Sequence, residues 1–568
     1  MTKPWLSSYA DNVPHEINVD PRPLHAFFED AVINFGDHGC LDFLDKKYTY
    51  AEIGDLVGRA AKGFQLLGVK AGVKVGLCLP NCPYYVICYY AILTAGGTVV
   101  NYNPLYVRKE LEFQAQDSET EIMVTLDLKQ LYPKVTHLME AADVKKVVVC
   151  SMTDILPPVK SVLFNIFKRS ELTKFDHDLQ HYSFDQLIQN DGLPDPVEID
   201  PDHDIAVIQY TGGTTGVPKG AVLTHANLVA NLRQVRGWLC DLTPGQERML
   251  CVLPFFHVFA MTVVLNLGIA SGMELIMVPR FELDEVLDLI NEKKPTLFPA
   301  VPTIYNAISQ HPKIRDYDLT SIRYCISGGA PLPLKTRTEF EELTGCSLVE
   351  GYGLSECSPV ATCNPIGGVS KEGSIGIPLP STQIIVRDMM PPYEAVEPGK
   401  KGEICIIGPQ VMKGYYHRIG ATEATFHHKS LKTGDIGYMD GDGYIFLVDR
   451  AKDLILCGGY NVYPRHVEEA IMQHRDVAEV TVIGIEDEYR GQAPKAFVKL
   501  KEGCKLREAE LKAFLHEYLS PIERPSEIEF RDELPKTMIG KLSKKELLAE
   551  EVAKKKNFMP KKEESHFD

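Results

Sequence analysis

The chain has 568 residues, 45% of them hydrophobic and 24% charged, which is the ordinary composition of a globular protein with more than one domain. This excludes wholesale disorder, a collagen-like repeat and a small scaffold held by disulfides. With 77 acidic and 60 basic residues the formal net charge is −17, so the chain lacks the excess of Lys and Arg that binding to nucleic acid requires.

The first part of the chain alternates between helix and strand patterns. Apolar residues fall on one face of a helix over 50–67, which Gly68 ends. A second helix is predicted over 84–94, and apolar strands are predicted over 74–79, 98–101, 121–125, 147–150 and 205–208. Such alternation is typical of parallel sheets covered by helices on both faces, so the predicted fold class is α/β.

The pattern changes after about residue 373, where short strands such as 383–386 and 402–407 are separated by Pro and Gly turns. From about residue 449, helices are predicted over 465–474 and 508–519, and strands over 480–485 and 496–500. We therefore expect four parts: a large N-terminal domain over 1–448, which includes a β-rich subdomain over about 373–448, a hinge over 449–452, a small mobile α+β domain over 453–550, and a Lys-rich disordered tail over 551–568.

The 14 cysteines are scattered between Cys40 and Cys504, without a C-x-x-C pair. Zinc sites and disulfide frameworks need clustered cysteines, so isolated thiols in a reducing, cytoplasmic setting are expected. Two uncharged runs, 75–107 and 249–273, are long enough to cross a membrane. Proline, glycine and polar residues interrupt both runs, so we expect each to form several short buried elements instead.

The most informative stretch is QYTGGTTGVPKG at 209–220, which follows a predicted strand. Its glycines let backbone amides converge on an anion, its threonine hydroxyls add donors, and Lys219 adds a positive charge. A Walker A loop does not fit, because Pro218 precedes the lysine and Gly220 follows it. A flexible surface turn is the plainer alternative, which the buried preceding strand disfavours.

YTGGTTGVPKG resembles the phosphate-loop signature of the adenylate-forming superfamily, which includes acyl-CoA synthetases, firefly luciferases and the adenylation domains of peptide synthetases. Further motifs of that family follow in its order within 204–542: LPFFHVF at 253–259, SGGAPLP at 327–333, EGYGLSE at 350–356, TGD at 433–435, DRAKDLILCGGYNVYP at 449–464 and PKTMIGK at 535–541.

The resemblance implies a role for each matching residue. ATP would be bound by Thr211, Gly212, Gly213, Thr214, Thr215, Gly216, Lys219, Gly329, Ala330, Gly351, Tyr352, Gly353, Asp435, Arg450 and Lys541. Thr215 and Glu356 would hold Mg²⁺, and Lys541 would contact the carboxylate and the α-phosphate during adenylation. Asp449 and Lys452 would form the hinge, with His257 and Gly459 along the acyl and CoA path.

Several of these residues also have plain structural explanations. Glu356 could be a solvated carboxylate at a helix start. Arg450 and Lys452 could be solvated linker charges. His257 lies in an apolar stretch, where a satisfied core histidine is the commoner case, so the sequence leaves its role open. The spacing of the last motif favours Lys541 over the other lysines nearby.

The resemblance implies a two-step reaction with ATP, Mg²⁺ and CoA, in which acyl-AMP forms and the acyl group then passes to CoA. From about residue 50 to 550 the chain is most similar to bacterial long-chain fatty acid–CoA ligases. Three alternatives stay open: a ligase for medium-chain or aryl acids, a fatty acyl-AMP ligase that supplies a carrier protein, and a non-catalytic acyl- or nucleotide-binding relative. Homodimerisation also stays open, as does peripheral membrane contact through lysines at 554–556 and 561–562.

Overall fold

The computed structural model describes residues 3–18, 22–175, 178–211, 217–450, 453–457, 460–487, 489–536 and 542–558. The chain divides into two compact units, which are described separately here. The large unit comprises Met1–Ile384, Ile406–Leu431 and Asp442–Tyr444, and the small unit comprises Ile385–Cys405, Lys432–Gly441 and Ile445–Asp568.

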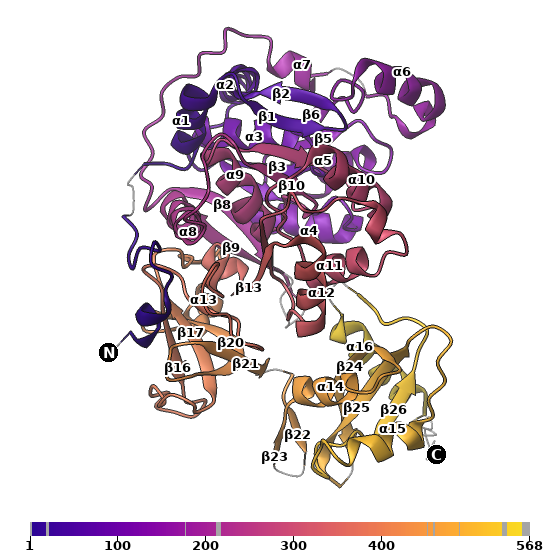
Figure 1. Cartoon of the computed structure of the whole chain (residues 1–568). Coiled ribbons are helices and arrows are strands. Elements are labelled where there is room, and N and C mark those ends of the chain that lie inside the picture. Colours follow the sequence, from indigo (N-terminus) through magenta and orange to yellow (C-terminus); the bar gives the residue numbers. More distant parts are fainter. Residues whose placement is uncertain are drawn as a thin grey trace, which may run out of the picture. The chain divides into compact units, whose positions relative to one another are not determined.

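The main sheet of the large unit has the strand order β18-β9-β8-β4-β3-β5-β6-β7 (Figure 1). Its strands are β3 (Lys74–Cys78), β4 (Thr98–Asn101), β5 (Ile122–Leu126), β6 (Lys146–Cys150), β7 (His181–Ser183), β8 (Ile205–Thr211), β9 (Lys219–Thr224) and β18 (Gly414–Tyr415). The sheet is parallel from β8 to β7, but β9 and β18 are antiparallel to their neighbours. The predicted parallel sheet is confirmed over the six strands from β8 to β7; β9 and β18 extend it antiparallel, because the connection 212–218 is too short for a parallel crossover.

Two smaller sheets complete the large unit. One has the order β10-β11-β1-β2, and the other has the order β12-β13-β14-β15. Their strands are β1 (Gly39–Phe43), β2 (Lys46–Thr49), β10 (Arg248–Cys251), β11 (Glu274–Met277), β12 (Tyr324–Ser327), β13 (Ser347–Gly353), β14 (Val360–Cys363) and β15 (Ile377–Pro378).

The helices of the large unit lie between these strands in the chain. They are α1 (His25–Phe35), α2 (Tyr50–Leu66), α3 (Pro83–Thr94), α4 (Arg108–Ser118), α5 (Tyr132–Ala141), α6 (Pro158–Phe167), α7 (Phe184–Leu187), α8 (His225–Trp238), α9 (Leu267–Ala270), α10 (Leu283–Lys293), α11 (Pro302–Ser309), α12 (Leu334–Thr344) and α13 (Ile419–Thr425), with a π-helix at Ala260–Asn266 and short 3₁₀ turns at Pro4–Ser8, Arg169–Glu171, Ile314–Asp316 and Ser355–Cys357.

Helix α2 confirms the amphipathic pattern predicted from residue 50. Thr49 caps it and Glu52 bonds back to the cap in a capping box, while Gly68, with φ +100°, follows its end. The apolar run 249–273 is also confirmed as several buried elements: β10, the π-helix and α9. Among the described residues, no helix combines the length and the apolar character needed to cross a membrane.

The small unit begins with most of a five-stranded sheet, ordered β16-β17-β20-β19 with β21 also paired to β20. A second sheet has the order β23-β22-β25-β24, with β26 beside β25. Strand β19 (Phe426–His427) of the first sheet belongs to the large unit. The other elements are β16 (Gln383–Arg387), β17 (Gly402–Ile407), β20 (Ser430–Met439), β21 (Ile445–Arg450), β22 (Ile455–Cys457), β23 (Tyr460–Val462), α14 (Pro464–Met472), β24 (Val477–Asp487), β25 (Gly491–Leu500), α15 (Glu508–Leu515), β26 (Glu527–Phe530) and α16 (Lys544–Phe558).

The predicted disordered tail is wrong for residues 551–558, because α16 continues to Phe558. Leu547 of this helix is fully buried. Glu551 pairs with Lys495 at 3.0 Å, and Lys554 pairs with Glu529 at 3.1 Å. From composition alone these charges are expected to be solvated. In the structure they pair with Lys495 on β25 and Glu529 on β26, and these pairs hold the helix in place. Residues 559–568 lie outside the described residues.

Candidate active site

The predicted phosphate loop joins the two strands of a β-hairpin. Thr211 at the end of β8 pairs with Lys219 at the start of β9. Strand β8 runs parallel to β4, so the loop leaves the sheet at the carboxyl ends of its parallel strands, where open α/β sheets bind ligands. Gly212, Gly213, Thr214, Thr215 and Gly216 lie outside the described residues.

Lys219, Tyr415 and Glu356 lie in a row beside this hairpin. Tyr415 belongs to β18, which pairs with β9, and its ring centroid is 5.0 Å from Nζ of Lys219. The Tyr415 hydroxyl donates a 2.7 Å hydrogen bond to Oε1 of the buried Glu356. Burial, and then the Glu356 carboxylate, raise the pKa of Tyr415, so the hydroxyl stays protonated and remains a donor.

The two glycine motifs expected to hold adenine come together at neighbouring strands. Strands β12 and β13 are parallel, and the backbone N–H of Leu332 donates to Oε2 of Glu350 at 3.2 Å. Gly329 has φ +77°, and a Cβ at Gly353 would lie 1.8 Å from the carbonyl oxygen of Pro359. These two positions therefore require glycine. Half-buried Ala330 and Tyr352 lie in the same two motifs.

The segment that holds His257 packs directly against the first of these motifs. A Cβ at Gly328 would lie 3.0 Å from the Phe259 ring, tighter than an ordinary contact, so glycine favours this approach. His257 is half-buried, and its Nδ1 accepts a 3.4 Å hydrogen bond from the backbone N–H of Phe259. The structure thus brings His257 near the predicted adenine motif without giving it a reaction role.

A buried amide network positions the same segment and was not predicted from the sequence. Asn81 donates to two carbonyl oxygens within 251–253, at 3.0 and 2.8 Å. Asn101 donates to Gln209 at 2.9 Å, and Gln209 donates at 3.1 Å to the carbonyl before His257. Both asparagines lie at or just after the carboxyl ends of β3 and β4, a position that could have marked them as site residues.

The small unit carries the predicted ribose-binding pair. Asp435 on β20 faces Arg450 on β21, and Nε of Arg450 lies 3.1 Å from Oδ1 of Asp435. The Asp435 backbone N–H donates to the Thr433 hydroxyl at 3.0 Å. Asp435 is buried; the turn holds its backbone, and the Arg450 guanidinium pairs with its carboxylate.

Asp449 connects the end of β21 to the start of α14. Its Oδ1 accepts from the N–H of Arg450 at 2.7 Å, and its Oδ2 accepts from the N–H of Arg465 at 2.8 Å. Burial raises its pKa, and the two backbone donors oppose that shift. The remaining predicted residues of this unit, Lys452, Gly459 and Lys541, lie outside the described residues.

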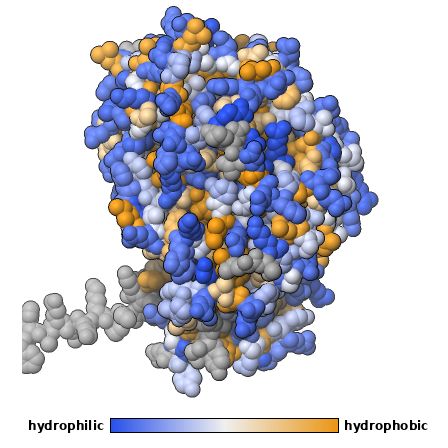
Figure 2. Space-filling view, turned by 90° about the vertical axis from the view of Figure 1, so that its left-hand side faces the viewer, coloured by the Kyte–Doolittle hydropathy of each residue, from blue (hydrophilic) through white to orange (hydrophobic). Residues whose placement is uncertain are grey.

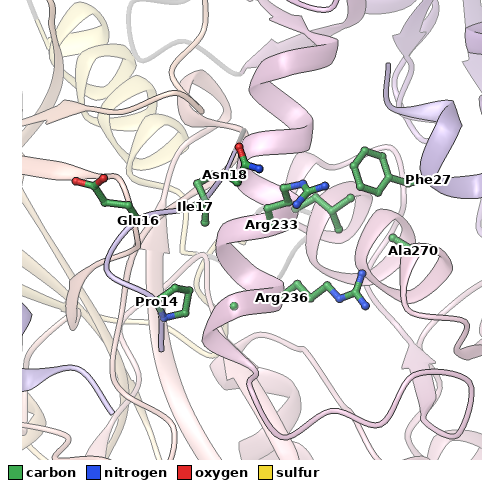
Figure 3. Close-up of a pocket in the computed structure, with 10 residues that line it drawn as sticks. Pro14, Glu16, Ile17, Asn18, Phe27, Arg233, Arg236 and Ala270 are labelled. Carbon is green, nitrogen blue, oxygen red and sulfur yellow. The ribbon is translucent and has the colours of Figure 1, made fainter. Parts of the chain in front are cut away.

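A separate pocket of about 360 Å³ lies among the N-terminal segment, α1, α8 and α9 of the large unit (Figure 3). Ile17, Phe27 and Ala270 make its lining mostly apolar, and Arg233 and Arg236 of α8 also border it. None of the predicted site residues lines this pocket. It therefore adds no residue to the candidate active site.

Two family models cover most of the chain. The model described as "AMP-binding enzyme" matches residues 28–416, and the model described as "AMP-binding enzyme C-terminal domain" matches residues 466–541. The chain belongs to the AMP-binding enzyme family. These matches confirm the resemblance inferred from the motifs, and they place the hairpin and the Glu356 turn in the first domain of that family.

Relatives of this family are similar over nearly the whole chain. The "Long-chain-fatty-acid--CoA ligase" of Bacillus subtilis is 43% identical over 97% of this chain and 98% of its own length. The protein of the same name from Yersinia pestis is 37% identical over 97% and 99%. A solved structure of ATP-bound MatB from Rhodopseudomonas palustris has a TM-score of 0.81 at 27% identity, covering 93% of this chain and 98% of its own. A structure of the Bacillus subtilis O-succinylbenzoate CoA synthetase, in complex with ATP and magnesium ion, has a TM-score of 0.74 at 27% identity, covering 92% and 98%.

Proposed function

We propose that this member of the AMP-binding enzyme family is a long-chain fatty acid–CoA ligase. A carboxylate oxygen of the acid attacks the α-phosphorus of ATP, the bond to the β-phosphate breaks, and acyl-AMP and pyrophosphate form. The thiolate of CoA then attacks the acyl carbon, and AMP leaves. The observation that supports this substrate class is the 43% identity to the Bacillus subtilis ligase over 97% of the chain.

The phosphates of ATP would bind at the hairpin, where Thr211 and Lys219 flank the loop 212–216. Glu356 fits a role as a Mg²⁺ ligand: it is a buried carboxylate whose Oε1 is held by Tyr415, and its second oxygen is the atom we assign to the metal. Among the described residues, no three His, Cys, Asp or Glu side chains group as a metal site. Mg²⁺ usually takes one or two carboxylates together with substrate phosphates, which suits Glu356 with Thr215, and it would neutralise phosphate charge.

Adenosine would be held in two parts. In the large unit the glycines of the two adenine motifs would let a flat base approach the backbone, and we assign the Tyr352 ring to stacking on that base. In the small unit Asp435 would accept both ribose hydroxyls, with Arg450 orienting the carboxylate. The residues assigned to the base are Gly329, Ala330, Gly351, Tyr352 and Gly353.

Catalysis would depend on positioning and charge, because no covalent nucleophile on the enzyme is needed. We assign the stabilisation of charge at the α-phosphorus to Lys541 and the approach of the CoA thiol to Gly459. Asp449 and Lys452 are the proposed hinge between a domain ending at residue 448 and a mobile small domain. Asp449 lies at the end of β21, where its side chain accepts from the backbone N–H groups of Arg450 and Arg465.

The cellular location of the enzyme, its contact with membranes and its oligomeric state are part of the same proposal. All 14 cysteines are free thiols, and all but Cys240 and Cys504 are buried, which supports a reducing, cytoplasmic environment. Long-chain acids partition into bilayers, so we propose peripheral contact with a membrane. Homodimerisation is a separate proposal, which sedimentation of the purified protein at several concentrations tests.

The test is a panel of acids assayed for AMP release with and without CoA. Acetate, octanoate, palmitate, oleate, benzoate and coumarate cover the competing classes. A CoA-dependent rate that is highest with palmitate or oleate is expected. A maximum with coumarate would favour the aryl-acid alternative. That alternative is supported by the 34% identity to the "Probable 4-coumarate--CoA ligase 1" of Dictyostelium discoideum. Formation of acyl-AMP without transfer of the acyl group to CoA would favour an acyl-AMP ligase. No reaction with any acid would favour a binding protein.

A further inference from the structure

Helix α6 presents its apolar side chains to solvent. Five of them recur at helical spacings of three and four residues and form one face, called here the apolar stripe. The stripe consists of Val159, Val162, Leu163, Ile166 and Phe167, which are 71%, 58%, 47%, 64% and 77% exposed. Ser161 and Phe164 are half-buried, and no residue of α6 is fully buried. A surface helix normally faces its apolar side inward, so α6 is inverted.

The inverted helix is fixed to the large unit at both ends. Ile155 and Leu156, just before it, are buried at 3% and 5% exposure. After it, the backbone N–H of Thr173 donates to the carbonyl of Asp127 at 2.8 Å. Within it, Lys160 donates to Oδ2 of Asp45 at 2.7 Å. The stripe is therefore displayed by an anchored element and does not result from a frayed end.

Charge around α6 differs in sign from the rest of the chain. Residues 157–175 contain four basic side chains and one acidic side chain, a local charge of +3 (4 − 1) in a chain of −17. The basic residues are Lys160, Lys168, Arg169 and Lys174, all exposed; Lys160 pairs with Asp45, so Lys168, Arg169 and Lys174 supply the basic flank. An apolar face with a basic flank matches the boundary between anionic lipid headgroups and acyl chains.

The position of α6 suits such a contact. Figure 1 shows it projecting from the outer edge of the large unit. The face in Figure 2, by contrast, is mostly hydrophilic with small scattered apolar patches, which is the ordinary state of a protein surface. A ten-residue helix is about 15 Å long, too short to cross a bilayer but able to lie in its interface.

We propose that α6 is the element that docks this protein on anionic lipid bilayers, with the apolar stripe inserted below the headgroups. The proposal deepens the proposed function, because a bilayer that contains the acid is then also the source of the substrate. It differs from a contact through the Lys-rich end of the chain, where Lys554 is the one lysine of 554–556 and 561–562 whose side chain the structure describes. Lys554 there pairs with Glu551 at 2.7 Å and Glu529 at 3.1 Å, so its charge is neutralised within the small unit.

The experiment compares the full chain with a double variant, Leu163→Asp and Phe167→Asp, by co-sedimentation with vesicles. Vesicles of phosphatidylcholine and phosphatidylglycerol, in a ratio of about 3:1, are set against pure phosphatidylcholine. The matched control is Ile33→Asp with Ile419→Asp, which changes charge equally at apolar residues exposed by 80% and 78%. We expect the stripe variant to lose about tenfold or more in partitioning to the anionic vesicles, and the control less than twofold.

Two readouts separate this proposal from the proposed function. Oleate supplied from cyclodextrin should be activated equally by the wild type and the stripe variant, whereas oleate embedded in anionic vesicles should be activated only slowly by the variant. Unchanged partitioning of the stripe variant, or no vesicle binding by an active wild type, would overturn the docking role. A wild type that forms dimers only with an intact stripe, and ignores vesicles, would assign the stripe to a second copy instead. Vesicle binding without ligase activity would overturn the proposed function alone.

Discussion

The Tyr415 hydroxyl donates a 2.7 Å hydrogen bond to Oε1 of Glu356, although the two residues are 59 positions apart in the chain. The same tyrosine ring lies 5.0 Å from Nζ of Lys219. One side chain therefore touches both charged groups that we assign to the phosphates and the metal. Tyr415 is a positioning residue: it orients Glu356 through a hydrogen bond.

Replacing Tyr415 with phenylalanine should weaken that orientation and keep the ring. We expect ATP–pyrophosphate exchange to fall about tenfold, with a larger requirement for Mg²⁺, because Glu356 loses the donor that holds its carboxylate. Exchange assayed over a magnesium titration measures both effects. Tyr416→Phe is the control, since that hydroxyl bonds Glu119 at 2.9 Å, and it should change exchange less than twofold. Equal losses in both variants would contradict the role of Tyr415.

Asp435→Asn should impair the binding of ATP more than the chemical step. Asparagine keeps the shape but loses the charge that pairs with Arg450 and would accept two ribose hydroxyls, so the KM for ATP should rise about tenfold or more. Steady-state kinetics with ATP varied at saturating acid provide the measurement. Glu403→Gln removes a charge in the same turn, where Glu403 accepts from Gly434 N–H at 3.1 Å, and should leave the KM near the wild-type value.

Lys541→Ala should separate the two half-reactions. The lysine is assigned to the α-phosphate during adenylation, so acyl-AMP formation should fall about a hundredfold or more, while supplied acyl-AMP should still react with CoA at a similar rate. Lys536→Ala is the matched control, because Lys536 pairs with Glu479 at 2.6 Å. Similar losses in both half-reactions would argue against the assignment.

Gly353→Ala should disturb the Glu356 turn through the backbone. The added Cβ would lie 1.8 Å from the carbonyl oxygen of Pro359, a clash that only a backbone shift relieves. We expect the Tm of the large unit to fall by about 5 °C or more, with loss of adenylation. At Gly351 an added Cβ would approach Ile326 Cγ2 at 3.3 Å, so Gly351→Ala should have a milder effect. Calorimetry that finds both variants equally stable would refute this reasoning.

Two buried histidines predict a loss of stability in mild acid. Burial lowers the pKa of His25 to about 4 and that of His225 to about 3, and Nδ1 of His225 accepts from the N–H of Leu24 at 3.1 Å. The unfolded chain binds protons at these histidines near pH 6.5, before the folded protein does. The contribution of these histidines to the free energy of unfolding is therefore fully present above that pH. It decreases as the pH falls below that value, by about 1.4 kcal/mol per histidine and pH unit.

Urea unfolding at about pH 7 and pH 5 measures this effect. His25→Phe keeps a ring of similar shape without the titrating nitrogens. The difference in the free energy of unfolding between pH 7 and pH 5 should therefore shrink by about half. A wild-type protein equally stable at both pH values would exclude the proposed contribution of this pair.

Local patterns predicted the regular elements well. The helix expected over 50–67 is α2, and the strand expected over 98–101 is β4, because side-chain periodicity and caps act within a few residues of the chain. The helix predicted over 508–519 ends at Leu515 instead. The tail prediction failed at Glu551 for a different reason, since the lysine that binds it lies 56 residues earlier.

The sequence by itself determined the family, the order of its motifs and the alternation of helices with apolar strands, because these depend on residue type and spacing along the chain. Only the tertiary structure decided that the phosphate loop joins a hairpin, that Tyr415 holds Glu356, and that Asn101 and Gln209 position the segment at His257. It also decided that α6 turns its apolar stripe outward. Each of these depends on which distant segments the fold brings together, and no local pattern encodes that choice.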